Sequence, residues 1–178
     1  QLHRRQRQMC IRDRSFSVPE ITGVWPALWM MPEKSVYGNW PRSGEIDIVE
    51  TINEKSDELV TTIHYGHDYH RQISKTTFLN QLTKLSNPID HNKISLIWED
   101  KYFEWFLNDQ LVFKVNFNEV ENLEPNPFLE EFYLLINVAV GGNWPGTPNS
   151  TMYCNSRKSC PDVKKLIVDY IAYYEKIN

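Results

Sequence analysis

Three carboxylates stand close together in the segment 44–50, Gly-Glu-Ile-Asp-Ile-Val-Glu, which otherwise has the composition of a buried β-strand. Carboxylates among β-branched residues carry a desolvation cost, so they need partners or a chemical task. On a regular strand Glu45 and Asp47 would share one face and Glu50 would point to the other. One extra residue at positions 48–49, a β-bulge, would return Glu50 to the face of the other two acids. We therefore predict a bulged strand that presents three acids on one surface.

Paired carboxyl groups suit the hydrolysis of glycosidic bonds. When they lie roughly 5–5.5 Å apart, one can attack the anomeric carbon while the other acts first as acid and then as base. An acid between them can hold a proton and push the pKa values of its neighbours apart. The pattern alone does not say which glutamate has which role.

Two tryptophan-rich motifs precede the acids and a third motif follows them. They read Trp-Pro-Ala-Leu-Trp at 25–29, Trp-Pro-Arg-Ser-Gly at 40–44 and Gly-Gly-Asn-Trp-Pro-Gly at 141–146. Together with Glu-x-Asp-x-x-Glu, this arrangement resembles glycoside hydrolase family 16, in particular the laminarinase-type endo-β-1,3-glucanases. The resemblance covers the chain from about residue 16 to its end.

The resemblance implies roles for the site residues. Glu45 corresponds to the nucleophile, Glu50 to the general acid/base and Asp47 to an assisting acid. His64 resembles a histidine on the strand beside the catalytic one, where it would hydrogen-bond Glu50 or a sugar, or serve structure alone. Asp169 corresponds to a carboxylate that binds a structural calcium in many relatives. No cofactor is implied for catalysis.

Aromatic rings stack on sugars as readily as they fill cores, so four tryptophans are candidate substrate contacts. Trp40 and Trp144 lie in polar loops, which favours stacking on substrate. Trp25 and Trp98 lie in strand-like runs, where core packing is nearly as well supported. We expect Trp29 and Trp105 in the core. The remaining histidines from residue 15 onward, in polar loops, show no metal-ligand spacing.

Short runs of β-branched and aromatic residues, separated by Gly, Pro and Asn turns, favour an all-β, antiparallel β-sandwich. The expected strands are 24–31, 44–50, 60–65, 93–98, 102–107, 110–115, 132–140 and 166–175, with 66–92 irregular. Because 132–140 is almost continuously apolar, both of its faces should be covered. The resemblance sharpens the fold to a concanavalin-like β-jelly roll with an open cleft, here apparently lacking N-terminal strands.

Length and charge suggest one domain preceded by a leader. The chain has 178 residues and a net charge of −4. Residues 1–14 contain five Arg and one Asp, leaving 14 basic against 22 acidic residues in 15–178, a net −8. We expect 1–14 to be a disordered or artefactual leader and 15–178 to be a partial catalytic domain. A basic segment can bind nucleic acid or an anionic surface, but this one has no hydrophobic period and no counterpart in the family pattern, so we expect neither partner. No apolar run approaches a membrane span.

Several features favour a secreted, monomeric protein. Cys154 and Cys160 are close enough in sequence for a short-loop disulfide, although two free thiols remain an alternative. Asn149-Ser150-Thr151 is a glycosylation sequon.

The expected function is hydrolysis of β-1,3-glucan, with β-glucan as the partner. A non-catalytic glucan-recognition protein on the same fold is less favoured, because all three acids are present. A lectin-like sandwich would not explain them. Family members acting on mixed-linkage glucan, agar or carrageenan share the acids, so the substrate stays open.

Overall fold

The computed structural model describes residues 7–11, 22–52, 57–79, 92–148, 166–168 and 171–175, the first of these ranges for its backbone only. Within these ranges the regular elements are antiparallel strands and two short 3-10 helices, Phe117–Glu119 and Pro127–Leu129. No helix among the described residues has the length and hydrophobicity needed to cross a bilayer.

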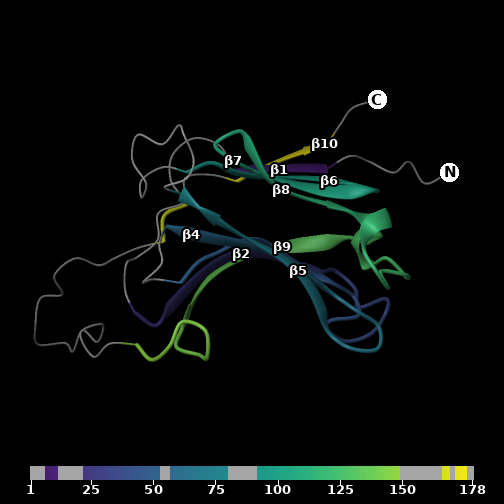
Figure 1. Cartoon of the computed structure of the whole chain (residues 1–178), viewed down its shortest axis with the longest axis horizontal. Coiled ribbons are helices and arrows are strands. Elements are labelled where there is room, and N and C mark those ends of the chain that lie inside the picture. Colours follow the sequence, from purple (N-terminus) through teal and green to yellow (C-terminus); the bar gives the residue numbers. More distant parts are fainter. Residues whose placement is uncertain are drawn as a thin grey trace, which may run out of the picture.

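The strands form two five-stranded sheets that face each other (Figure 1). One sheet has the order β10-β1-β6-β7-β8 and the other β5-β4-β3-β2-β9. Their bounds are β1 Arg7–Ile11, β2 Val24–Pro32, β3 Glu45–Glu50, β4 Glu58–Tyr65, β5 Arg71–Phe78, β6 Ile94–Glu99, β7 Tyr102–Leu107, β8 Gln110–Asn116, β9 Phe132–Val140 and β10 Ala172–Glu175. The predicted antiparallel sandwich is confirmed.

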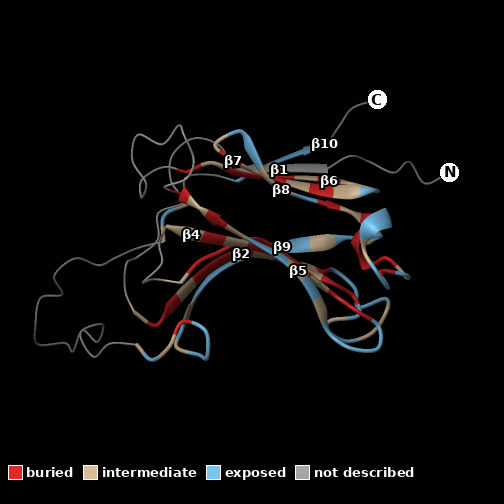
Figure 2. Cartoon of the chain, viewed as in Figure 1, coloured by how far each residue is buried: buried red, intermediate tan, exposed pale blue. Residues whose placement is uncertain are grey.

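The core lies between the two sheets, where Figure 2 shows the buried segments facing one another. Apolar side chains of β2, β3 and β4 meet those of β6, β7 and β8 there, with Leu28, Ile46, Phe103 and Trp105 fully buried. The other face of the β5-β4-β3-β2-β9 sheet is turned away from this core. Because side chains alternate between the two faces of a strand, every second side chain of these strands points to this other face and is available for a site.

Two segments expected to lack structure are strands. Arg7–Ile11 pairs with both β6 and β10, so the expected disordered leader is wrong for these five residues. Sequence reasoning missed this strand because its partners are more than 80 residues away. β5 falls in the segment expected to be irregular, but pairs with β4 along its whole length. Its polar residues suggested a loop, whereas they belong to an edge strand. The boundary at residue 15 stays a prediction.

β9 also differs from expectation. It lies at the edge of its sheet and pairs with β2. Tyr133, Ile136, Val138 and Val140 are exposed, so the prediction that both faces of this strand are covered is wrong. An apolar run indicates a β-strand, but it does not show whether other elements cover both faces of that strand. The last strand is shorter than expected, 172–175 instead of 166–175.

Candidate active site

The bulge in β3 lies where the spacing of the acids predicts it. On β2, the neighbours Leu28 and Trp29 pair with Val49 and Asp47, which leaves one residue of β3 without an opposite. On β4 the pairing also shifts between Asp47 and Glu50. An extra residue in one strand reverses the alternation of faces beyond it. Glu50 therefore returns to the face of Glu45 and Asp47.

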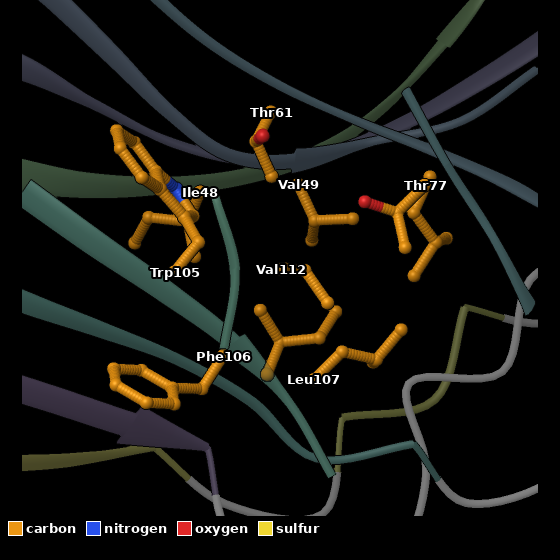
Figure 3. Close-up of a pocket in the computed structure, with 10 residues that line it drawn as sticks. Ile48, Val49, Thr61, Thr77, Trp105, Phe106, Leu107 and Val112 are labelled. Carbon is orange, nitrogen blue, oxygen red and sulfur yellow. The ribbon is translucent and has the colours of Figure 1, made fainter. Parts of the chain in front are cut away.

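The two residues of the bulge both enter the core. Ile48 and Val49 are each 1% exposed. They line a small void between the sheets together with Trp105, Leu107 and Val112 (Figure 3). Two consecutive side chains on one side of a strand are possible only where the pleat is interrupted. The packing of Ile48 and Val49 in the core thus holds the bulge in place, and with it the positions of the three acids on the opposite face of β3.

Glu45 is partly exposed and meets a tryptophan of the preceding loop. Nε1 of Trp40 donates a hydrogen bond to Oε2 of Glu45 at 2.5 Å. The loop is folded back by Ser43, whose hydroxyl donates to the carbonyl of Gly38 and accepts from the amide of Tyr37. Trp40 remains 49% exposed, so its indole can hold the carboxylate and still offer area to a ligand.

Glu50 lies at the other end of the acid row and is buried. Its Oε1 accepts a hydrogen bond from Nε1 of Trp25 at 2.9 Å, and the ring of Trp25 meets that of Trp144 edge-on at 4.9 Å. Burial raises the pKa of Glu50 to about 8, and the neighbouring carboxyl group of Asp47 adds to the rise, while the indole of Trp25 opposes it. Glu50 is therefore protonated at neutral pH, as a general acid must be.

Asp47 lies between the glutamates and is 1% exposed. Burial, followed by the charge of Glu45 and a hydrogen bond with it, raises the pKa of Asp47 to about 9. Oδ2 of Asp47 lies 3.0 Å from Nε2 of His64, although this oxygen accepts no well-formed hydrogen bond from the described residues. Asp47 thus holds a proton beside Glu45. His64 lies against Asp47, so of the roles considered for it, contact with a sugar and a structural role stay predictions.

The tryptophans divide between the site face and the core. Trp40 and Trp144 are exposed, and Trp25 contacts Glu50, so substrate contact by these three stays a prediction. Trp98 is buried and donates to the carbonyl of Phe128, so it is a core residue. Trp29, expected in the core, is partly exposed and donates to Oδ1 of Asn137 at 2.7 Å.

Sequence reasoning missed three residues of this face. Trp29 shares a strand face with Trp25, a spacing of four that could have been recognised. Asn137 lies opposite Ala27, which in turn lies opposite Glu50, so only strand pairing reveals it. His70 contacts His64 from a loop. Asp169, Cys154 and Cys160 lie outside the described residues, so the calcium and disulfide predictions remain predictions.

Oxygen or nitrogen atoms of Glu45, Asp47 and His64 lie within 4.8 Å of one another. Calcium takes six to eight oxygen ligands, far more than this set offers. The raised pKa of Asp47 and its hydrogen bond with Glu45 are instead accounted for by a proton shared between two acids. We assign the cluster to acid chemistry.

The fold is a two-sheet jelly roll, and its bulged strand carries two glutamates that accept hydrogen bonds from indoles. This combination is typical of glycosidases with a β-sandwich fold. A family described as "XgeA-like, catalytic GH16 domain" matches residues 5–96. The chain therefore belongs to glycoside hydrolase family 16.

Two enzymes of known name are similar to this protein over most of the chain. Glucan endo-1,3-beta-glucosidase A1 of Niallia circulans is 34% identical over 177 residues, covering 89% of this chain and 23% of that protein. Keratan-sulfate endo-1,4-beta-galactosidase of Sphingobacterium multivorum is 34% identical over 125 residues, covering 70% of this chain and 29% of that protein.

Solved structures agree on the fold. The laminarinase catalytic domain of Thermotoga maritima MSB8 superposes with a TM-score of 0.68 at 27% identity, covering 86% of this chain and 59% of that one. The chain thus spans less than a third of these two curated relatives and about three fifths of the solved domain.

Proposed function

We propose that the protein is a retaining endo-β-1,3-glucanase that acts on laminarin-like glucans. The observation that carries the proposal is the bulge, which brings Glu45, Asp47 and Glu50 to one face with Glu50 protonated. The similarity to the Niallia glucan endo-1,3-beta-glucosidase and to the Thermotoga laminarinase supports the choice of β-1,3-glucan.

The reaction follows from the states of the two glutamates. Glu50 gives its proton to the glycosidic oxygen while a carboxylate oxygen of Glu45 attacks the anomeric carbon, which breaks the bond to the leaving sugar. Glu50, now ionised, then takes a proton from water. That water displaces Glu45 from the anomeric carbon, and the original configuration returns. The proton on Asp47 stabilises the negative charge that Glu45 regains.

The polarity of the site face favours a neutral glycan. Strand pairing places polar, uncharged side chains of β5 on the same face as the acids, namely Gln72, Ser74 and Thr76. Among the described strand residues of this face none is Lys or Arg. A sulfated glycan would call for cations there. The chain is nevertheless 34% identical both to the Niallia glucosidase and to the keratan-sulfate galactosidase. Keratan sulfate must therefore be tested beside laminarin.

The test is reducing-sugar release from laminarin, lichenan, agarose, carrageenan and keratan sulfate by the same protein. We expect hydrolysis of laminarin and none of the sulfated glycans. Preference for keratan sulfate or carrageenan would overturn the substrate, and inactivity on all five with retained laminarin binding would favour a glucan-recognition protein.

Glu45→Gln tests the chemistry. Gln cannot form the glycosyl-enzyme ester, so we expect hydrolysis to be abolished while the circular dichroism and melting curve stay those of a folded protein. Azide should rescue Glu45→Ala and give a glycosyl azide of inverted configuration. Full activity of Glu45→Gln would exclude Glu45 as the nucleophile.

We further infer an extracellular location and a monomer, from the sequon and the cysteine pair noted above and from the absence of any requirement for a second chain in this chemistry. Secretion into the culture medium and the mass in solution would check both.

A further inference from the structure

His70 stands beside the nucleophile end of the site, although no strand carries it. It ends the loop 66–70 between β4 and β5, and its Nε2 lies 2.8 Å from Nδ1 of His64. The two imidazoles are stacked with centroids 5.0 Å apart. The ring of Trp40 packs on His70 at 4.7 Å, while the same indole donates to Glu45. His70 is therefore connected to Asp47 through His64 and to Glu45 through Trp40.

The loop holds this histidine in place by several contacts. Gly66 has φ 125°, and a Cβ there would lie 2.1 Å from the carbonyl oxygen of Tyr69, so only glycine allows the loop to close so tightly. Nε of Arg42 donates to the carbonyl of His67 at 2.8 Å, which ties the loop to the one that carries Trp40. The guanidinium of Arg71 lies over the ring of Tyr69.

The charged and titratable groups around His70 come from three strands and two loops. β3 contributes Glu45 and Asp47, β4 contributes His64 and β5 contributes Arg71, while the loops contribute Arg42 and Tyr69. Burial and the neighbouring His64 lower the pKa of His70, against an opposing effect of Glu45. At neutral pH the ring is neutral and carries one N–H.

The contact between His64 and Asp47 fixes where a proton can be. Nε2 of His64 and Oδ2 of Asp47 are 3.0 Å apart, and Oδ2 is buried without a well-formed hydrogen bond. Two bare lone pairs at this distance repel, so one atom carries a proton. If Nε2 of His64 carries this proton, the O–H group of Asp47 can point to Glu45. If Oδ2 of Asp47 carries it, the O–H group of Asp47 points to His64 and no longer donates to Glu45.

The other nitrogen of His64 decides between these arrangements. A neutral imidazole has one donor and one acceptor nitrogen, so Nε2–H requires that Nδ1 accept. His70 is the group that faces Nδ1, and a donor there selects this form. If His70 is the donor, the N–H groups all point one way: from His70 to Nδ1 of His64, and from Nε2 of His64 toward Oδ2 of Asp47, 3.0 Å away. The proton of Asp47 is then left for Glu45, which also accepts from Trp40.

We propose that His70 is a positioning residue: by donating from Nε2 to Nδ1 of His64 it sets the tautomer of His64 and so turns the proton of Asp47 toward Glu45. The effect of this arrangement on turnover rests on the proposed glucanase function, because it concerns the charge that Glu45 regains when the glycosyl group leaves. The proton arrangement itself does not require any substrate.

The direct test uses the ¹⁵N shifts of the His64 ring in the full chain, assigned by comparison with His64→Gln. We expect Nε2 protonated and Nδ1 bare in the unsubstituted protein. His70→Phe keeps a ring against Trp40 but removes the donor, so it should give a mixture of tautomers. His70→Gln restores a donor and should restore the Nε2–H form. His67→Phe, the same change three residues away, is the matched control and should alter nothing.

Kinetics on laminarin give the second readout. His70→Phe should lower kcat by about five- to tenfold, the worth of one neutral hydrogen bond, with KM unchanged. His70→Gln should recover most of that loss, and His67→Phe should equal the unsubstituted protein. A purely structural role of His70 would instead lower the melting temperature of both His70 variants and leave the tautomer unchanged.

The outcomes separate this inference from the proposed function. The expected tautomers in a protein that hydrolyses none of the glycans would refute the glucanase function and keep the role of His70. Laminarin hydrolysis with His64 protonated on Nδ1, or with a tautomer that His70→Phe leaves unchanged, would overturn the role of His70 alone.

Discussion

The raised pKa of Glu50 predicts a specific dependence of stability on pH. The pKa of this carboxyl is 4.5 in the unfolded reference and about 8 in the folded protein. Between these values the folded state binds the proton and the unfolded state releases it, so Glu50 lowers the free energy of unfolding as pH rises. The sign is opposite to that of a salt-bridged carboxylate. Below pH 4.5 the group has no such effect.

The magnitude follows from the same two values. From pH 4.5 to 7 the interval is about 2.5 pH units, and at about 1.36 kcal/mol per unit this amounts to about 3 kcal/mol of lost stability. Glu50→Gln removes the titration and keeps an oxygen for the indole of Trp25. The variant should match the unsubstituted protein near pH 4 and exceed it by about 3 kcal/mol at pH 7.

The assay is urea unfolding followed by tryptophan fluorescence at half-unit steps from pH 4 to 8. Glu121→Gln, the same change at an exposed position, is the matched control for the substitution itself. A stability difference for Glu50→Gln that is constant over this range would refute the reasoning, because it would mean that Glu50 ionises alike in both states.

Three further predictions concern the surroundings of the acids. Trp25→Phe removes a hydrogen bond that lowers the pKa of Glu50, so the alkaline limb of the pH–rate profile should move to higher pH; a move to lower pH would contradict this. Ile48→Ala should cost about 2–5 kcal/mol of stability in urea unfolding, since it empties the packing beneath the bulge, and a loss below 1 kcal/mol would argue against that support. Gly66→Ala should lower the melting temperature, because its Cβ would overlap the carbonyl of Tyr69, and an unchanged temperature would show that the loop closes differently.

The acid row could be predicted because its signal is local. Glu-x-Asp-x-x-Glu breaks a period of two by one residue, and a bulge is the one strand feature that repairs it. Hairpins such as 102–116 follow from short turns between alternating runs in the same way. In both cases the residues that determine the structure are close in the chain, so the local sequence pattern is enough to predict it.

What could not be predicted depends on distant pairing. Trp98 lies in a run that is apolar on both faces, so nothing local shows which face is the core. Trp29 was assigned to the core for the same reason, and its hydrogen bond to Asn137 links positions 108 residues apart. His70 gains its neighbours only because a tight loop folds it back onto β4.

The two indoles also make the oxygens of each carboxyl group unequal. An indole N–H can only donate, so the oxygen it meets must keep a lone pair for it. In Glu50 that oxygen is Oε1, which places the acidic hydrogen on Oε2. In Glu45 it is Oε2, so the indole leaves Oε1 for the attack in the proposed reaction. Under the proposed function, one oxygen of each carboxyl group is thereby set apart for proton delivery or for attack before a sugar arrives.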